Sequence, residues 1–507
     1  MSNSSSNQRG YVYLVGAGPG DPGLITKRGL DCLARAEVVL YDYLVNPLIL
    51  AHAPTNAQVV CLGRHGTDRV MSQTAINEML IAHARQGQVV VRLKGGDPAV
   101  FARGAEEAEV LAANEIPFEI VPGITAALAA GSHAGIPVTH RELASAVALV
   151  TGREQAGVET KLDFDALAKF PGTLVFYMGV TTSKEWTAAL IDAGKPADTP
   201  VAMVRRCSWT DQETISCTLE EVPTELQARS LRPPVIVIVG EVCDLAPTLA
   251  CLDQRPLLGE TVMVTRPREQ AIGFCERLGE LGAGALLQPA IAIEPPQDWA
   301  PVDDALARIE KFNWLVFSSA NGVRFLLDRL LAEHGDLRRL ANVQIATIGP
   351  RTADELRRYH LKADLAPNEY RAEALAVALE ENAAGKSFLL ARASRGREVL
   401  SEQLTASGAM ITQVVVYESR DVPEPQQHVA DALGAGKIDW ITVTSSAIAR
   451  SLHAMFGDEL KKSKLASISP ITSATLRELG HEPDIEATVY TTDGLIEVLL
   501  SAVAVED

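Results

Sequence analysis

Short apolar runs alternate with helical patterns along the first half of the chain. The runs that predict buried strands are Val12–Val15, Val38–Tyr41, Val59–Leu62, Val89–Leu93 and Phe118–Val121. Helical spacing of apolar residues begins at about Leu24 and again at Ser72. Strands and helices in strict alternation are typical of an α/β domain with a mostly parallel sheet.

The same alternation continues beyond Ala146. Four further strand-like runs lie at Ala146–Gly152, Thr173–Gly179, Pro200–Cys207 and from Val235 onward. They predict a second α/β unit of about 100 residues. The proline-containing segment that follows has no clear period, so we place a linker at residues 251–258.

The second half of the chain repeats its own pattern three times. The matched segments are Phe312–Leu327 with Ile438–Leu452, those starting at Val343 and Leu465, and those starting at Glu260 and Lys386. Each is a strand, a turn rich in Ser, Thr or Gly, and a helix, which predicts two similar α/β lobes. Residues 284–296 and 408–425 each run into prolines and are expected to pass side by side between these lobes.

Composition narrows the possible partners. The 507 residues carry a net charge of −18, which argues against a nucleic-acid or anionic membrane surface. No apolar run reaches the roughly 18 residues of a membrane span. The seven cysteines form no C-x-x-C pair, so we expect neither disulfides nor a metal site, and a cytoplasmic location. Residues 1–9 are polar and predict a disordered tail.

The loop from Gly16 to Asp21 follows the first strand, and we expect it to bring main chain close to a ligand. A dinucleotide site is one hypothesis, but Pro19 interrupts the expected helix start and Asp21 opposes a phosphate. Asp42, at the end of the second strand, keeps that hypothesis open. Asp42 itself is either a carboxylate on the ligand side of the sheet or a cap or turn residue.

Six motifs occur in one order: VGAGPGDPGLIT, VVLYDYLV, VVRLKGGDPAVFARGAEE, VPGITAA, GIPVTHR and LVFYMGV. Together they resemble the tetrapyrrole methyltransferases, and within them the uroporphyrinogen-III C-methyltransferases, over about Gly10–Asp244. The resemblance implies two α/β lobes with S-adenosylmethionine folded in a cleft between them and S-adenosylhomocysteine as product. It implies cofactor contacts at Pro19, Gly95, Gly96, Asp97, Val100, Thr125, Ala126, Met178 and Cys207.

The resemblance also assigns catalytic positions. Asp42 matches a carboxylate proposed as proton acceptor, and Arg64 takes the position of a lysine proposed as proton donor. Because arginine is effectively never deprotonated, we interpret Arg64 as an anchor for a substrate carboxylate. A substrate with many carboxylates needs cations, and the candidates are Arg64, Arg103, Arg141 and Arg205. We expect half of these to form ordinary surface ion pairs instead.

The second half resembles uroporphyrinogen-III synthase over about Leu258–Ala502. The matching motifs are VTRP from Val264, FSSANGV from Phe317, IGPRTA from Ile348, VVVYES around Tyr417, TSS from Thr444 and SPITSA from Ser469. The resemblance implies cyclisation of hydroxymethylbilane with inversion of the last ring, loss of water and no cofactor. Tyr417 would assist departure of the hydroxyl group. Substrate contacts are expected at Arg266, Ser318, Asn321, Arg351, Thr352, Arg392, Ser446 and Thr472, although half of the Ser and Thr residues could instead cap helices.

The predicted fold class is therefore α/β: a two-lobed tetrapyrrole methylase fold followed by a two-lobed synthase fold. Residues 10–250 form the first domain, with lobes of about 10–125 and 126–245. Residues 259–507 form the second, with lobes of about 259–293 plus 416–507 and 294–415.

The expected function is bifunctional: formation of uroporphyrinogen III and its double methylation to precorrin-2, a sirohaem and cobalamin precursor. A homodimer through the methyltransferase half is expected. The alternatives are another precorrin methyltransferase as first half, and a ligand-sensing, scaffold or other non-catalytic tetrapyrrole-binding module as second half.

Overall fold

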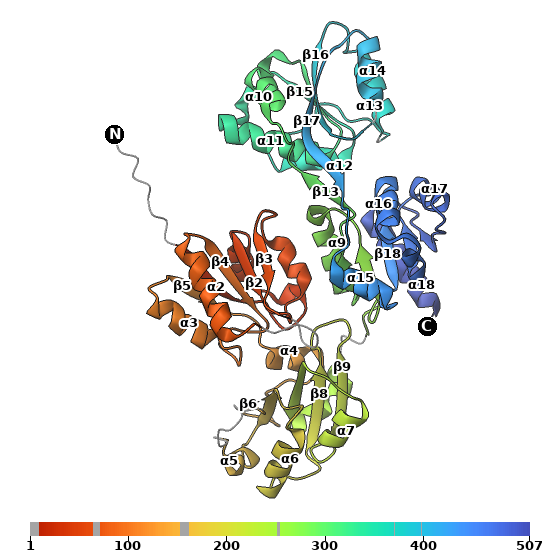
Figure 1. Ribbon diagram of the computed structural model, residues 1–507. Coiled ribbons are helices and arrows are strands. Elements are labelled where there is room, and N and C mark those ends of the chain that lie inside the picture. The colour runs from red at the N-terminus through yellow and green to blue at the C-terminus, as the bar shows by residue number, and fades with distance from the viewer. Residues whose placement is uncertain are drawn as a thin grey trace. The chain divides into compact units, whose positions relative to one another are not determined.

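The computed structural model of the chain describes residues 10–63, 71–152, 162–250, 254–369, 371–396 and 398–506. The described residues form four α/β lobes, each built on a five-stranded sheet. Many of their helices and strands are labelled in Figure 1. The chain separates into two compact units. One holds Met1–Gln288, Gln426–Ala449 and Asp458–Asp507, and the other holds Pro289–Pro425 and Arg450–Gly457. Within the described ranges, no helix is long and apolar enough to span a bilayer.

The first lobe is a parallel sheet with the strand order β3-β2-β4-β1-β5. Its strands are β1 (Tyr11–Gly16), β2 (Val38–Tyr41), β3 (Gln58–Cys61), β4 (Val89–Lys94) and β5 (Phe118–Val121). Its helices are α1 (Lys27–Leu33), α2 (Gln73–Arg85) and α3 (Gly104–Ala113), with 3-10 turns η1 (Pro22–Leu24) and η2 (Pro47–His52). Helices α2 and α3 cover one face, and α1 and η2 cover the other. Burial of both faces explains why the inner strands β1, β2 and β4 are mainly apolar.

The helix expected from about Leu24 begins later than predicted. Residues Pro22–Leu24 form η1, and α1 starts only after Thr26, whose side chain accepts a hydrogen bond from the Gly29 amide. The helix expected at Ser72 begins there, because Ser72 Oγ accepts the Ala75 N–H at 3.2 Å as an N-cap.

The second lobe has the strand order β6-β7-β10-β8-β9. Its strands are β6 (Val147–Thr151), β7 (Thr173–Tyr177), β8 (Pro200–Arg205), β9 (Glu213–Thr218) and β10 (Val235–Val239). Its helices are α4 (Ala126–His133), α5 (Phe164–Ala168), α6 (Ser183–Asp192), α7 (Val222–Ala228) and α8 (Ala246–Leu249), with η3 (Glu241–Leu245). The prediction of four strands missed β9, because this edge strand is half polar and pairs with β8 alone.

The third lobe is a parallel sheet with the order β12-β11-β18-β19-β20. Its strands are β11 (Thr261–Val264), β12 (Gly284–Leu287), β18 (Trp440–Val443), β19 (Lys464–Ser467) and β20 (Ile485–Glu486). Its helices are α9 (Arg268–Glu280), α15 (Gln427–Gly434), α16 (Ser446–Phe456), α17 (Pro470–Glu478) and α18 (Thr492–Glu506), with η7 (Gly457–Lys462).

The fourth lobe has the order β13-β17-β16-β14-β15. Its strands are β13 (Ile291–Glu294), β14 (Trp314–Phe317), β15 (Gln344–Thr347), β16 (Ser387–Ala393) and β17 (Met410–Asp421). Its helices are α10 (Ala300–Ala307), α11 (Ala320–His334), α12 (Pro350–Arg357), α13 (Ala372–Glu380) and α14 (Val399–Ala406), with η5 (Ile309–Lys311) and η6 (Leu337–Leu340). The expected side-by-side pairing of the two proline-ended segments is present as the antiparallel contact of β13 with β17.

Four neighbouring strands have the same order in the third and fourth lobes, as the sequence repeat predicts. Strands β11-β18-β19 of the third lobe correspond in order and sequence to β16-β14-β15 of the fourth. A hydrogen bond next to the central strand is also present in both lobes. Asn313 Oδ1 accepts the Ser387 N–H at 2.9 Å, and Asp439 Oδ2 accepts the Thr261 N–H at 2.8 Å. The polar residue before each tryptophan therefore fixes the start of the neighbouring strand.

Candidate functional site

Three glycine-bearing loops meet at the carboxyl edge of the first lobe's sheet. They follow β1, β4 and β5, which are neighbours in that sheet. Gly18 and Gly96 exchange main-chain hydrogen bonds of 3.2 and 2.8 Å. A Cβ added to Gly123 would lie 2.3 Å from the oxygen of Gly96, and one added to Gly16 would lie 2.6 Å from Gly123 Cα. Gly16 and Gly123 are thus required for backbone to pack on backbone.

Gly96 differs from these two because a Cβ would fit there in ordinary van der Waals contact with its neighbours. A Cβ added there would meet no atom closer than 3.9 Å, and its φ of +71° favours glycine. Its neighbour Asp97 ties the loops together: Oδ1 accepts the Ala99 N–H at 2.7 Å and Oδ2 accepts the Gly123 N–H at 2.9 Å. The surroundings of Gly96 are therefore main chain with few side chains.

Trp209 of the second lobe closes onto the first loop. Its Nε1 donates to the main-chain oxygen of Pro19 at 3.0 Å, and Ser208 Oγ accepts the Asp21 N–H at 3.0 Å. The Arg206 guanidinium lies over the indole, 4.2 Å from the ring centroid. The Asp21 carboxylate accepts the Gly23 N–H at 2.8 Å and so caps η1. Pro19 and Asp21 are therefore fixed by contacts within the protein.

A second contact joins helix α4 to β7. Thr125 Oγ1 lies 2.6 Å from the Tyr177 hydroxyl, which also accepts the Ala127 N–H at 2.8 Å. Burial raises the pKa of Tyr177, so it stays a neutral phenol. Met178 follows with a φ of +54° and an exposed side chain, and the Phe101 ring lies 5.0 Å from that of Tyr177.

These contacts bring most of the predicted cofactor residues to one junction. Thr125 and Ala126 begin α4 beside Gly96, and Gly95 lies next to the loop after β2. Val100 packs against the core of the second lobe. Cys207 is buried, and its burial raises the pKa of the thiol to about 12, so it contributes packing and not a thiolate.

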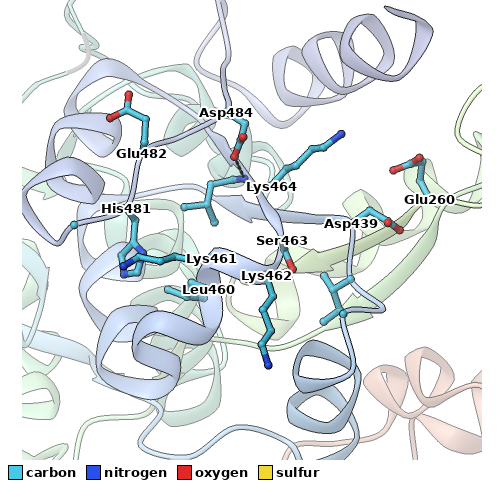
Figure 2. Close-up of a pocket in the computed structure, with 14 residues that line it drawn as sticks. Glu260, Asp439, Leu460, Lys461, Lys462, Ser463, Lys464, His481, Glu482 and Asp484 are labelled. Atoms are coloured by element: carbon cyan, nitrogen blue, oxygen red, sulfur yellow. Dashed lines mark hydrogen bonds between the residues drawn. The ribbon is translucent and has the colours of Figure 1, made fainter. Parts of the chain in front are cut away.

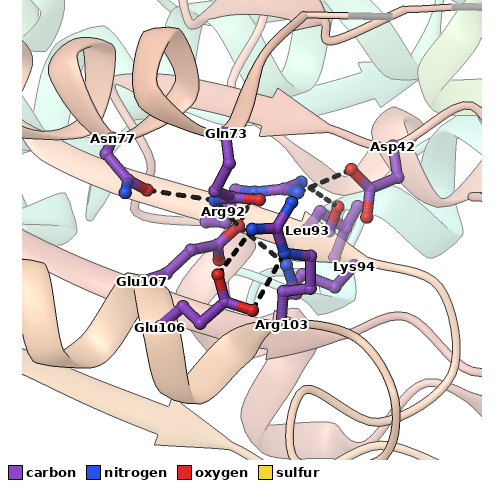
Figure 3. A network of polar contacts seen from close by, with 9 residues as sticks. All are labelled: Asp42, Gln73, Asn77, Arg92, Leu93, Lys94, Arg103, Glu106 and Glu107. Carbon is purple, nitrogen blue, oxygen red and sulfur yellow. Dashed lines mark hydrogen bonds and ion pairs between the residues drawn. The ribbon is translucent and has the colours of Figure 1, made fainter. Parts of the chain in front are cut away.

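Asp42 lies at the end of β2 in an ion pair (Figure 3). Its Oδ1 accepts from Arg92 Nη2 at 2.6 Å, and the side chain is 30% exposed. Arg92 also donates from Nε to Glu107 Oε1 at 3.2 Å, and Lys94 Nζ donates to the same oxygen at 2.8 Å. Arg92, Lys94 and Glu107 are buried. The carboxylate expected to accept a proton is thus backed by a buried cluster of charges.

The predicted substrate arginines of this half differ in their surroundings. Arg103 is exposed and pairs with Glu106 at 2.5 Å, beside the buried cluster in Figure 3. Arg205 pairs weakly with Asp211 at 3.6 Å, and Arg141 is exposed. Arg64 lies outside the described residues. Ion pairing at Arg103 and Arg205 is the ordinary role expected for half of this set.

Tyr417 of β17 is buried in the fourth lobe. Its hydroxyl lies 3.0 Å from Ser319 Oγ, and its ring stacks on Phe325 at a centroid distance of 5.8 Å. Burial raises the pKa of Tyr417, opposed by hydrogen bonds with Ser319 and Asn321. Asn321 therefore lies beside Tyr417, and the phenol keeps its proton.

Other predicted residues of the fourth lobe lie at strand and helix ends. Ser319, not Ser318, caps α11, accepting the Gly322 N–H at 3.0 Å, so Ser318 is left exposed without the capping role. Thr352 is buried in the first turn of α12 beside exposed Arg351. Arg392 pairs with Glu398 and donates to Gln413 Oε1 at 3.0 Å.

In the third lobe the predicted contacts are also at the loops after strands. Arg266 is buried and donates to Gln270 Oε1 at 2.9 Å. Ser446 Oγ accepts from Thr475 Oγ1 at 2.8 Å, whereas Ser445 caps α16 through the Ile448 N–H. Thr472 is buried in the first turn of α17, 3.1 Å from Ser469 Oγ. The residues that cap α11 and α16 are therefore Ser319 and Ser445, which are neighbours of the predicted Ser318 and Ser446.

A cavity of 610 Å³ lies in the third lobe at the opposite edge, where β18 and β19 begin (Figure 2). Its lining includes Lys461, Lys462, Lys464, His481 and Glu482. Two further acidic residues of the lining accept hydrogen bonds within the fold. Asp484 accepts one from the Leu465 N–H at 2.7 Å, and Glu260 accepts one from Trp440 Nε1–H at 3.0 Å. Because ligands of parallel sheets bind where strands end, we do not assign this cavity to the site. Among the described residues, no His, Cys, Asp or Glu cluster is arranged to hold a metal ion.

Sequence reasoning missed the residues that support this site. Tyr177 lay in the quoted LVFYMG motif, next to the predicted Met178. Arg92 and Glu107 lay in the long motif around Gly95, where charged residues inside an apolar strand and helix are a signal of buried pairing. No local sequence pattern indicated Trp209, because its partner Pro19 lies 190 residues earlier in the chain.

Comparison with known families gives one match in each half. The family model of tetrapyrrole (corrin/porphyrin) methylases matches residues 11–223. The model of uroporphyrinogen-III synthase HemD matches residues 274–497. Both resemblances inferred from motifs are thereby confirmed, as is the α/β fold class.

Individual relatives cover one half or both. The porphyrin biosynthesis protein HemD of Ruminiclostridium josui is 33% identical over 97% of this chain and 98% of its own length. The uroporphyrinogen-III C-methyltransferase of Bacillus subtilis is 36% identical over 72% of this chain and 75% of its own length. The S-adenosyl-L-methionine-dependent uroporphyrinogen III methyltransferase of Methanosarcina barkeri is 46% identical over 47% of this chain and 94% of its own length. The chain therefore belongs to the tetrapyrrole methylases through its first half and to the uroporphyrinogen-III synthase family through its second, as a fusion of the two.

Proposed function

We propose that the chain is a bifunctional enzyme that makes uroporphyrinogen III and methylates it. The second half cyclises hydroxymethylbilane with inversion of the last ring, and the first half methylates the product twice to precorrin-2, a precursor of sirohaem and cobalamin. The observation that carries the proposal is the alignment of one porphyrin-biosynthesis relative across 97% of the chain. The two reactions also fit each other, because the product of one is the substrate of the other.

The junction of the first and second lobes fits S-adenosylmethionine. The main chain at Gly95, Gly96 and Pro19 and the start of α4 at Thr125 offers polar groups with few side chains in the way, which suits a ligand with many polar atoms. When bound, the cofactor supplies an electrophilic methyl group on its sulfonium sulfur. The protein's part is orientation, which supplies most of the rate enhancement in such transfers.

Asp42 provides a base for the proton released after a pyrrole carbon has accepted the methyl group. Its half-exposed carboxylate at the end of β2 points to the same sheet edge as the glycine loops. Arg103, Arg141 and Arg205, together with Arg64, are assigned to the substrate's carboxylates. The exposed pair of Arg103 with Glu106 can exchange its partner for such a carboxylate at small cost.

In the second half we assign Tyr417 to the departing hydroxyl group. A neutral phenol held by Ser319 gives its proton to the leaving hydroxyl oxygen, which departs as water, and the phenol regains a proton when the substrate loses one on ring closure. No cofactor enters this reaction. The assigned substrate contacts are Arg266, Ser318, Asn321, Arg351, Thr352, Arg392, Ser446 and Thr472.

We assign the domains with the boundaries that the sequence predicts. We place the methyltransferase in residues 10–250, the linker in 251–258 and the synthase in 259–507, in a cytoplasmic homodimer formed through the methyltransferase half. Light scattering of the full chain and of residues 10–250 tests the dimer. A monomeric full chain contradicts it.

The deciding experiment gives the purified chain hydroxymethylbilane with and without S-adenosylmethionine. We expect type III uroporphyrinogen without cofactor and a dimethylated product with it. Formation of the type I isomer alone rules out the synthase activity, and absence of methylated product rules out the methyltransferase activity. In Asp42→Asn, methylation should fall strongly while S-adenosylhomocysteine still binds. Unchanged turnover would make Asp42 a turn residue.

A further inference from the structure

The buried charges behind Asp42 form one connected cluster from two elements of the first lobe, β4 and α3, with Gln73 of α2 beside them. Arg92 and Lys94 lie two residues apart on β4, so both side chains point to the face covered by α2 and α3. Glu107 comes from α3, and its Oε1 accepts from Arg92, Lys94 and Gln73 at 3.2, 2.8 and 3.2 Å. Asp42 lies at the exposed end of this cluster (Figure 3).

The Arg92 guanidinium is held at each of its three nitrogens. Nε donates to Glu107, Nη1 donates to the main-chain oxygen of Leu93 at 3.2 Å, and Nη2 donates to Asp42 Oδ1 at 2.6 Å. The side chain of Arg92 is 3% exposed and that of Glu107 is fully buried. A planar group fixed at three points has one orientation, so it determines where it meets Asp42.

Lys94 completes the balance of charge. With Lys94 also bonded to Glu107, the two cations face two carboxylates, and the charge of Glu107 is shared between them. Arg92 is therefore not neutralised by Glu107 alone and keeps its attraction for Asp42. Without Lys94, Glu107 would compete with Asp42 for the same guanidinium.

Stability alone is a weak reason for this arrangement. Removing charges from water costs more than a surface pair returns, and buried ion pairs are often no more stabilising than apolar residues of the same size. Here the buried charges converge on a half-exposed carboxylate at the edge of the sheet where the substrate is proposed to bind.

We infer that Arg92, fixed by Glu107 and Lys94, is a positioning residue that holds the Asp42 carboxylate in one orientation for proton acceptance during methyl transfer. The inference rests on the proposed methyltransferase function of the first half. Arg92 itself touches neither substrate nor cofactor in this scheme. Its effect on catalysis must therefore pass through Asp42.

The test is a double-mutant cycle in the full-length chain, with methyl transfer to supplied uroporphyrinogen III as the readout. Arg92→Gln should lower kcat about tenfold to hundredfold, with little change in the KM for S-adenosylmethionine or in S-adenosylhomocysteine binding. Asp42→Asn and the double variant should have the same kcat, because Arg92 has nothing left to position. Additive losses in the double variant overturn the inference.

Two further variants keep the test decisive. Arg92→Lys retains the charge but cannot reach all three partners, so it should fold and show a smaller loss that also vanishes on the Asp42→Asn background; it replaces Arg92→Gln if that variant fails to fold. Arg28→Gln is the matched control, since Arg28 pairs with Glu119 at the surface of the same lobe. Its kcat should stay within about twofold. A wild-type chain without methyl transfer overturns function and inference together, whereas an active chain with an additive cycle overturns the inference alone.

Discussion

The indole Nε1 of Trp209 donates a hydrogen bond to the main-chain oxygen of Pro19 at 3.0 Å, so a residue of the second lobe fixes the glycine loop of the first. The indole also fills the place of a side chain at the next position. A Cβ on Gly20 would lie 2.3 Å from both Cδ1 and Nε1 of Trp209. Gly20 is thus a glycine because of a contact with the other lobe, not because of its own backbone conformation.

Gly20→Ala should therefore weaken S-adenosylhomocysteine binding. The added methyl group displaces the indole, which loses its bond to Pro19 and frees the loop. We expect an affinity about tenfold lower, equivalent to about 1.4 kcal/mol, measured by calorimetry. Gly273→Ala is the control, because a Cβ at that helical position meets nothing within 4 Å. Its affinity should equal that of the wild type, and wild-type affinity in Gly20→Ala would contradict the prediction.

The elements that are buried on both faces could be predicted from the sequence. Strands such as β1 and β10 are continuous apolar runs, and the repeated segments of the second half predicted the similar strand order of the third and fourth lobes. Strand β9 escaped because its polar positions face solvent at a sheet edge. Strands buried on both faces could therefore be recognised from the sequence, whereas a strand with an exposed polar face could not.

The site could be predicted only where its residues are close in sequence. Gly95, Gly96 and Asp97 form one motif, and they do meet the loops after β1 and β5. The pairing of Arg92 with Asp42 depends instead on β2 lying beside β4, a neighbour relationship that no local pattern contains. The same holds for Tyr177 with Thr125, which lie 52 residues apart in the sequence.

Tyr417→Phe tests the second half independently of the first. Loss of the hydroxyl removes the donor assigned to the leaving group and its contact with Ser319 at 3.0 Å. We expect cyclisation of hydroxymethylbilane to slow about tenfold, below the full effect of a general acid because folding of the substrate supplies the rest.

The control for this variant is Tyr359→Phe. The Tyr359 hydroxyl donates to Asp328 at 2.7 Å at the surface of the same lobe, so its loss should leave cyclisation unchanged. Methyl transfer from supplied uroporphyrinogen III should be unaffected in both. A cyclisation rate in Tyr417→Phe equal to that of the control would remove Tyr417 from the proposed chemistry.

We expect acid to lower the stability of the fourth lobe through protonation of Glu398. Hydrogen bonds from Arg392, then Gln413 and Ser401, lower the pKa of Glu398 from 4.5 to about 2. The unfolded chain binds more protons between these values, so the stabilising contribution is complete above about pH 4.5 and is lost as the pH falls toward 2. The melting temperature of Glu398→Gln should lie below that of the wild type at pH 7, and the difference should shrink in acid.

Glu381→Gln serves as the comparison for this titration, because Glu381 is an exposed carboxylate for which the described residues provide no ion pair. Its difference from the wild type should be small at every pH. Since Glu398 is at the surface, added salt should also reduce its effect. A difference for Glu398→Gln that stays constant from pH 7 to pH 2.5 would show that the ion pair with Arg392 contributes nothing.

Asp439 and Asn313 occupy equivalent places in the two lobes of the second half, and each accepts a main-chain N–H from the start of the neighbouring strand. If only an acceptor oxygen is needed, Asp439→Asn should be nearly neutral. Asp439→Ala should instead leave the Thr261 N–H without its partner, at a cost of about 1 kcal/mol at this exposed edge. Hydrogen exchange of the Thr261 amide measures this locally, without a single unfolding transition for the whole chain. Exchange should quicken in Asp439→Ala alone, and equal quickening in both variants would show that the charge of Asp439, not its acceptor oxygen, holds the strand.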